Sequence, residues 1–143
     1  AVAAAEFALY DYVVLGDTLE NPSHPDHANA VAIMNAAATS GTQFFGYVDL
    51  GVSTQDLSIA DVQLRVDQWL AAGADGIFFD DFGYDFGTPR DRQNTAVDYA
   101  HSRGLPVVAR ARQVAAGLAE GGLGLEQARD GGETGGVAIL DHP

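Results

Sequence analysis

Five short hydrophobic runs recur along the chain and determine the architecture that we predict from the sequence. They begin about 30 residues apart, the length of a strand plus a helix that crosses back to a parallel neighbour. Apolar residues occupy both odd and even positions of each run, which is typical of parallel strands buried on both faces. The predicted strands are residues 12–17, 44–50, 76–81, 105–110 and 136–141.

The segments between these runs have helical spacing and capping residues. Ser58 is the predicted N-cap of one helix, with Asp61 in its first turn. Thr88 is the predicted cap of another, with Pro89 at its first position, and a third helix is expected over about 27–40. Glycines that fit left-handed C-caps end the three helices. They are Gly41, Gly73 and Gly104, and the sheet-facing positions are Val31, Met34, Ala38, Val62, Val66, Trp69, Leu70, Ala96, Val97 and Ala100.

Alternation of strands and helices predicts an α/β fold with a parallel sheet. The regular period favours a (β/α) barrel-like architecture over an open doubly wound sheet, but eight units need about 250 residues. We therefore expect a partial or truncated TIM barrel of about five strands in residues 1–110. Residues 111–143 form a Gly-rich, atypical C-terminal segment, with a short helix over 123–129 and one more strand. Open sheet edges predict a homo-oligomer or a covering segment that is missing.

Charge and composition narrow the classes of partner. The 143 residues include seven Lys and Arg against 20 Asp and Glu, a formal net charge of −13 that disfavours nucleic acid and anionic membranes. No apolar run approaches the roughly 20 residues that span a bilayer. Cysteine is absent, so composition leaves the compartment open. The chain begins at Ala1 with neither an initiator Met nor a signal peptide, so we expect that an upstream segment was removed.

Acidic residues end the predicted strands. Parallel pairing would bring such residues to one rim, where ligands bind in both α/β architectures. They are Asp17, Asp49, Asp80, Asp81 and Asp141. Like charges on one rim shift the pKa values of their neighbours, which allows one carboxyl to serve as an acid beside an ionised partner. The alternative is that each Asp caps the helix that follows.

The stretch "DDFGYDFG" is less easily explained by capping, because the next helix is expected only near Pro89. Neighbouring residues on a strand point to opposite faces, so Asp80 and Asp81 can share a substrate only if the chain turns, as Phe82-Gly83 would permit. Tyr84 would then offer its ring to a sugar or pack onto the sheet.

Other motifs carry weaker signals. The loop "HPDH" supplies His24, Asp26 and His27 near Glu20 and could hold a metal, although Pro-Asp more often marks a turn. We therefore assign no metal. Phosphate loops, a Cys nucleophile and a GxSxG elbow are all absent from the sequence.

Residues 10–109 resemble the spherulin-type and endo-α-1,4-polygalactosaminidase-like glycoside hydrolases, which are TIM barrels. The likeness lies in "FFGYVDLG", "DQWLAAGADGIFFDDFGYDF" and "RQNTAVDYAHSRGLPVV". It implies hydrolysis of an α-linked amino-sugar polysaccharide without a cofactor, and an extracellular or cell-surface location. The residues implied as catalytic are Asp49, Asp80 and Asp81, and the substrate-binding candidates are Asp17, Tyr47, Tyr84, Asp85 and Arg110.

The sequence departs from that family before its first helix and after "GLPVV", where "ARARQVAAGLAEGG" replaces the expected strand end. Two functions are therefore carried forward. The first is a glycoside-hydrolase-like domain that acts on or binds polysaccharide through strand-end carboxylates. The second is a non-catalytic structural or self-assembling protein built from a truncated barrel.

Overall fold

The computed structural model describes residues 2–112 and 135–140. Its centre is a five-stranded sheet in the order β1-β2-β3-β4-β5, in which neighbouring strands are also neighbours in the sequence. Strands β1 to β4 pair in parallel and alternate with helices, which confirms the α/β class and the parallel sheet over this part of the chain. The pairing is consistent with part of a (β/α) barrel, and closure into a barrel stays a prediction.

The elements follow the predicted alternation and include an N-terminal helix that the sequence pattern did not suggest. In chain order they are α1 (Val2–Phe7), β1 (Tyr12–Leu15), α2 (His27–Ala37), β2 (Gln43–Asp49), α3 (Ile59–Ala72), β3 (Gly76–Asp80), α4 (Arg90–Ser102), β4 (Val107–Arg112) and β5 (Gly135–Leu140), with 3-10 turns η1 (Ala38–Ser40) and η2 (Tyr84–Phe86).

The fifth strand corrects the prediction of an all-parallel sheet. β5 pairs antiparallel with β4, with Leu140 opposite Val107 and Gly135 opposite Arg112. The carboxyl end of β5 therefore lies at the opposite end of the sheet from those of β1 to β4. Asp141 itself, like the helix expected over 123–129, falls outside the described residues.

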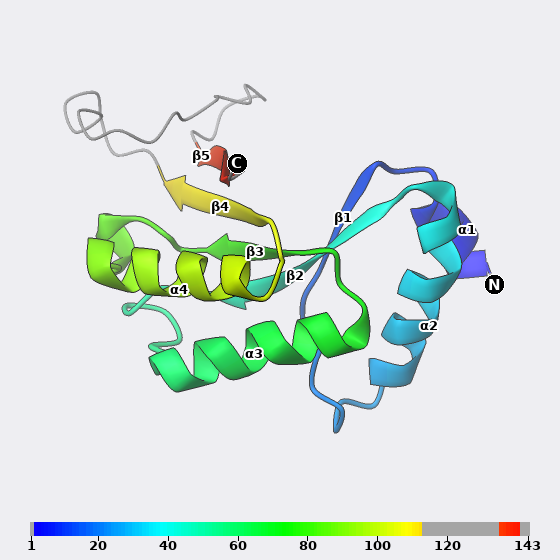
Figure 1. Cartoon of the computed structure of the whole chain (residues 1–143), viewed down its shortest axis with the longest axis horizontal. Helices are drawn as coiled ribbons and strands as arrows, with labels where there is room; N and C mark the ends of the chain where they lie inside the picture. The colour runs from blue at the N-terminus through cyan, green and yellow to red at the C-terminus, as the bar shows by residue number, and fades with distance from the viewer. Residues whose placement is uncertain (1, 113–134, 141–143) are drawn as a thin grey trace.

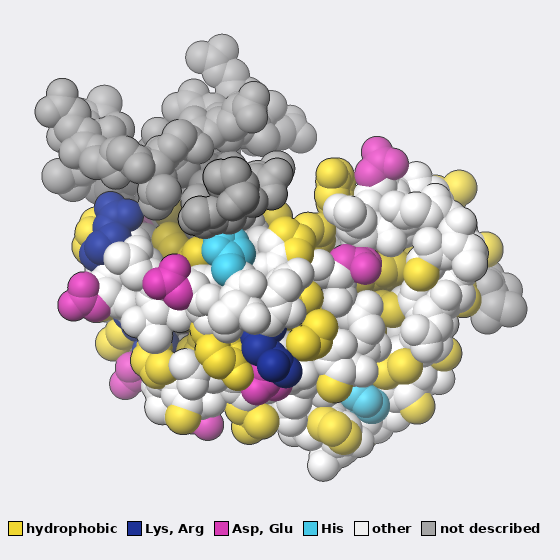
Figure 2. Space-filling view, in the orientation of Figure 1, with side chains coloured by type: hydrophobic (Ala, Val, Ile, Leu, Met, Phe, Trp, Pro, Cys, Tyr) yellow, Lys and Arg dark blue, Asp and Glu magenta, His cyan; other side chains and the backbone are white. Residues whose placement is uncertain are grey.

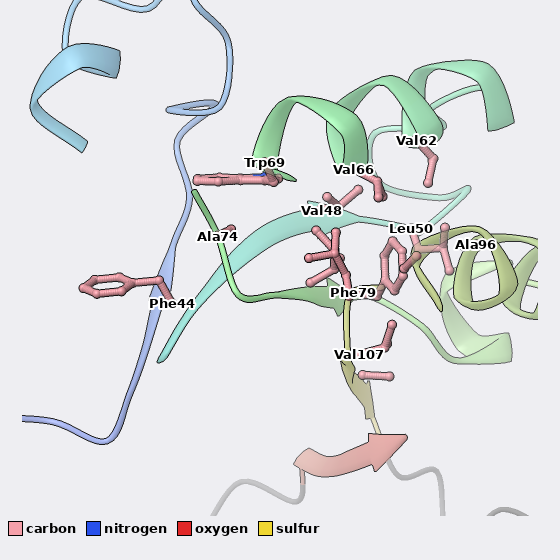
Figure 3. Close-up of a cluster of buried hydrophobic side chains, with 14 of the residues drawn as sticks. Phe44, Val48, Leu50, Val62, Val66, Trp69, Ala74, Phe79, Ala96 and Val107 are labelled. Carbon is pink, nitrogen blue, oxygen red and sulfur yellow. The ribbon is translucent and has the colours of Figure 1, made fainter. Parts of the chain in front are cut away.

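Helices α3 and α4 lie side by side on one face of the sheet (Figure 1). The core between them and the strands includes Val66 and Trp69 from α3 and Ala96 from α4, all at most 1% exposed. Figure 3 shows α3 directing Val62, Val66 and Trp69 toward Val48 and its neighbours on the sheet. This apolar burial is the main stabilising contribution, worth roughly 25 cal/mol for each Å² removed from water.

Local signals in the sequence placed the helix ends well. The Ser58 hydroxyl accepts a hydrogen bond from the Asp61 amide at 3.0 Å, which confirms the predicted cap of α3. All three predicted C-terminal glycines adopt left-handed backbone with φ between 76° and 105°. The helix expected over 27–40 instead ends as α-helix at Ala37 and continues as η1, so Ala37 rather than Ala38 is buried.

The predicted cap of α4 is wrong. Pro89 takes the N-cap position and the helix begins at Arg90. Thr88 is fully buried, and its hydroxyl donates to the Asp81 carbonyl at 2.9 Å, with the Leu50 carbonyl oxygen farther away at 3.3 Å. The buried position explains the difference, because a buried hydroxyl must find a partner and two carbonyl oxygens lie within reach.

We expected every strand to be buried on both faces, and β1 does not fit this expectation. On β1, Tyr12 is 65% and Val14 is 46% exposed, and both lie on the face opposite α3 and α4. Two cross-strand ring pairs occupy the same face, Tyr12 with Phe45 and Tyr47 with Phe78. We call the face opposite α3 and α4, which carries these side chains, the second face of the sheet.

Candidate functional site

The carboxyl ends of β2 and β3 bring three predicted catalytic residues together. Asp49 and Asp80 are register partners on the two strands, and Asp81 follows directly in the chain. The two side chains approach each other at Gly51, where an added Cβ atom would lie 2.9 Å from the Asp81 Cβ and 3.3 Å from Asp49 Oδ1. Asp49 is 4% exposed, whereas Asp80 and Asp81 are partly exposed, so the group faces solvent through Asp80 and Asp81.

A single backbone angle allows Asp80 and Asp81 to share this edge. Asp81 has φ +52°, a left-handed conformation that is uncommon for a residue with a Cβ atom. The turn that the sequence pattern assigned to Phe82-Gly83 therefore occurs at Asp81. The Thr88 hydroxyl donates to the Asp81 carbonyl at 2.9 Å and stabilises the turn.

The Asp80 carboxylate is held in place by donors from three strand ends. Its Oδ2 accepts a hydrogen bond from the Tyr47 hydroxyl at 3.0 Å, and its Oδ1 accepts one from the Asp81 amide at 2.9 Å. The Arg110 Nε lies 3.7 Å from the same Oδ1. These contacts fix the orientation of the Asp80 carboxylate at the edge of the sheet.

The pKa values of two neighbouring groups, Asp81 and Tyr47, are raised. Burial raises the pKa of Asp81 to about 6, and the charges of Asp80 and Asp49 and the hydrogen bond with Asp49 add to the rise, while Arg110 opposes it. Burial, followed by the Asp80 charge, raises the pKa of the Tyr47 hydroxyl well above its usual range. The site thus contains one carboxyl, that of Asp81, which takes up a proton in mildly acidic solution.

The loops around the carboxyls are bound to each other. The amides of Val52 and Ser53 donate to the Phe86 carbonyl at 2.9 and 3.0 Å, joining the loop after β2 to the loop after β3. Arg92, near the start of α4, donates to the carbonyls of Leu50 and Leu57 at 2.8 and 2.7 Å. Such bonds restrict loop motion and keep the carboxyls in place.

Gly51 leaves room for the Asp49–Asp81 contact. A Cβ atom at this position would lie 2.3 Å from Thr54 Oγ1 and 2.9 Å from the Cβ of Asp81. The Thr54 hydroxyl and the Gly51 amide both donate to Asp49 Oδ1, at 2.6 and 2.8 Å. Any larger residue at position 51 would therefore displace a group that touches one of the two carboxyls.

Of the remaining predicted substrate-binding residues, Tyr84 and Asp85 lie in the loop after β3, and Asp17 lies apart from the carboxyl cluster. Tyr84 is 64% exposed in η2, and Asp85 is exposed beside it. Asp17 is not brought to the cluster. β1 ends opposite Gly46, before the end of β2, and the Asp17 carboxylate is 94% exposed, with Oδ2 3.8 Å from His24 Nε2.

The histidine loop is organised around a buried carboxylate. Glu20 is 2% exposed, its Oε1 lies 3.8 Å from Arg65 Nη1, and burial raises its pKa. His27 Nδ1 lies 2.7 Å from the Leu19 carbonyl oxygen. Within residues 2–112 and 135–140, no three or more His, Asp or Glu side chains are arranged to hold a metal ion.

Sequence reasoning missed several residues that build the site. Thr54, Thr88 and Arg92 touch the carboxyls or the loops that carry them. Gln93 is also buried, and its amide donates to the carbonyls of Phe82 and Thr88. Its spacing from Ala96 and Ala100 places a polar residue on the apolar face of the helix, which was the available signal.

Comparisons of the chain with family models, curated proteins and solved structures found no match. In the described part of the chain, no helix is long and apolar enough to cross a bilayer. Figure 2 shows acidic side chains dispersed over the visible face among hydrophobic and uncharged ones.

Proposed function

We propose that this chain is a glycoside-hydrolase-like domain that acts on or binds an α-linked amino-sugar polysaccharide through Asp49, Asp80 and Asp81. The observation that carries the proposal is the meeting of Asp49, Asp80 and Asp81 at one edge of the sheet. Asp80 is held by Tyr47 and Arg110, and the pKa of Asp81 is raised to about 6. Glycoside hydrolysis requires two such carboxyls.

In this proposal Asp81 is the acid and Asp80 is the nucleophile or base. The Asp81 proton passes to the glycosidic oxygen as the bond to the sugar carbon breaks. The Asp80 carboxylate either attacks that carbon or takes a proton from the attacking water. Tyr47 and Arg110 hold Asp80, and the exposed ring of Tyr84 stands at the rim for a sugar face.

The test is to incubate the protein with a deacetylated α-1,4-linked galactosamine polymer and to measure the reducing ends that hydrolysis releases. Asp80→Asn should lower the rate by about 10³-fold or more, because it removes the ionised group that acts on the sugar carbon. Asp98→Asn is the matched control, since Asp98 is an exposed carboxylate on α4. Absence of both product and polymer binding in the unaltered protein would overturn the proposal.

A second candidate is a structural protein that assembles through its sheet. The specific observation that favours it is the exposure of Tyr12 and Val14 on β1, an edge strand of the sheet. Unpaired backbone groups along an edge strand readily pair with another chain.

A further inference from the structure

Gln93 is a buried amide on α4 that bridges the two ends of the loop between β3 and α4, residues 81–89. Its side chain is 5% exposed. The Nε2 atom donates to the Phe82 carbonyl at 2.7 Å and to the Thr88 carbonyl at 3.1 Å. Two carbonyl oxygens fit only the NH₂ end of an amide, so both of its hydrogens are engaged. One side chain thus closes the loop that begins with Asp81.

The backbone that follows the left-handed residue Asp81 is held by three separate parts of the chain. The Asp81 carbonyl accepts a hydrogen bond from the Thr88 hydroxyl at 2.9 Å. The Phe82 amide donates to the Arg110 carbonyl of β4 at 3.1 Å, and the Phe82 carbonyl accepts from Gln93. A left-handed residue with a side chain persists only where its surroundings hold it. Gln93 contributes twice, directly at Phe82 and through the carbonyl of Thr88.

We propose that Gln93 is a positioning residue that locks the turn at Asp81 and so keeps the Asp81 carboxyl at the edge of the sheet with Asp80. Its two hydrogen bonds go to backbone carbonyls, so its effect on the carboxyl is indirect. An apolar side chain of the same length would satisfy the packing on α4 but would leave both carbonyls without this donor. The consequence for catalysis rests on the proposed function, whereas the position of the Asp81 carboxyl is a property of the protein without substrate.

The titration of Asp81 reports this position. Burial is the main cause of its raised pKa, and the charges of Asp80 and Asp49 add to it while Arg110 opposes it. A turn that opens would expose the carboxyl to water and move it away from the two acids. The pKa of Asp81 would then fall toward the ordinary value of 3.8.

The experiment is a pH titration of the Asp carboxyl carbons by ¹³C NMR, without substrate, for the unaltered protein, Gln93→Met and Asn94→Met. Asp81→Asn assigns the resonance, whose step in the unaltered protein should lie near pH 6. Gln93→Met should lower this step by about one pH unit or more, because the turn loses its donor. Asn94→Met is the matched control and should leave the step in place, since Asn94 is exposed on α4.

Hydrogen exchange of the side-chain amides tests the same bonds in the unaltered protein, and it decides the question if Gln93→Met does not fold. The Gln93 NH₂ protons should exchange with water about tenfold more slowly, or slower still, than those of Gln43, which is exposed on β2. Equal exchange rates would overturn the proposal, as would a folded Gln93→Met whose Asp81 step stays near pH 6.

In the hydrolysis assay, Gln93→Met should lower kcat by about tenfold with a smaller change in KM, because a misplaced acid weakens the reaction more than the binding. The titration and the exchange measurement use no polysaccharide. An unaltered protein that neither hydrolyses nor binds the polymer would therefore overturn the proposed function and leave the role of Gln93 in placing Asp81 standing.

Discussion

At the residue scale, Asp81 combines a backbone angle and a carboxyl environment that both oppose stability. Its φ of +52° is unfavourable for a residue with a side chain, and its carboxyl is partly withdrawn from water beside two other acids. Such combinations are typical of residues kept for function rather than for folding. The hydrogen bond from the Thr88 hydroxyl to the Asp81 carbonyl holds the residue in place.

The raised pKa of Asp81 predicts a pH dependence of stability. The folded protein binds this proton more tightly than the unfolded chain, whose Asp pKa is near 3.8. The contribution is therefore fully present below pH 3.8 and is lost as the pH rises through about 6. Asn resembles the neutral carboxyl. The free energy of unfolding of Asp81→Asn should therefore exceed that of the unaltered protein by about 1 kcal/mol at pH 7.5 and equal it below pH 4.

Urea denaturation between pH 4 and 7.5 measures this difference. The quantity to follow is the free energy of unfolding of Asp81→Asn minus that of the unaltered protein, because other carboxyls titrate in the same range. Asp98→Asn is the control and should give a difference independent of pH, since its carboxylate is exposed on α4. A flat difference for Asp81→Asn would contradict the assignment of the proton to this site.

At the element scale, the packing of α3 on the sheet depends on a glycine, Gly46, which has no side chain. Trp69 lies over Gly46 of β2, and a Cβ atom at Gly46 would be 2.2 Å from the indole ring. The indole Nε1 also donates to the Tyr47 carbonyl at 3.1 Å, which fixes the ring along the strand. The middle of β2, the strand that carries Asp49, is thus positioned by one helix residue.

Gly46→Ala should destabilise the protein by about 3 kcal/mol, because a buried ring and its helix must move. Gly16→Ala is a matched control. Its nearest neighbour, Tyr47 Cβ, would lie at an ordinary 3.5 Å, so its effect should stay within about 0.5 kcal/mol. Thermal or chemical denaturation compares the two variants. Equal stabilities would show that α3 does not depend on close packing of Trp69 over Gly46.

At the scale of the whole molecule, α3 and α4 cover one face of the sheet, and β1 forms one of its edges. The exposed side chains near that edge include Leu9, Tyr10, Tyr12 and Val14. In the structural alternative, these groups pair with another chain through the edge and the second face.

That alternative predicts self-association that depends on concentration and weakens in Tyr12→Lys. A lysine on an edge strand disfavours pairing with a second strand. Leu64→Lys on α3 is the control, because Leu64 is similarly exposed, at 54%, but lies on a helix. Light scattering over a range of concentrations distinguishes the outcomes. A monomer at every concentration would count against assembly and leave the hydrolase-like proposal as the only candidate.

The sequence by itself determined the features that depend on neighbouring residues. Hydrophobic spacing located the strands, the Ser58 hydroxyl capped the helix that follows it, and glycine ended helices where a left-handed residue was needed. Placement of Asp49 and Asp80 at neighbouring strand ends also followed, because parallel pairing aligns the ends of successive strands. These are local or strictly periodic effects, which a pattern along the chain can express.

Only the tertiary structure decided how the site is assembled. The left-handed turn at Asp81 depends in part on Thr88, and the hydrogen bonds that hold Asp49 come from Gly51 and Thr54. The direction of β5 was likewise missed, because an apolar run pairs equally well in either direction. In each case the outcome is set by groups that meet only after folding, so neither spacing nor composition along the chain expresses it.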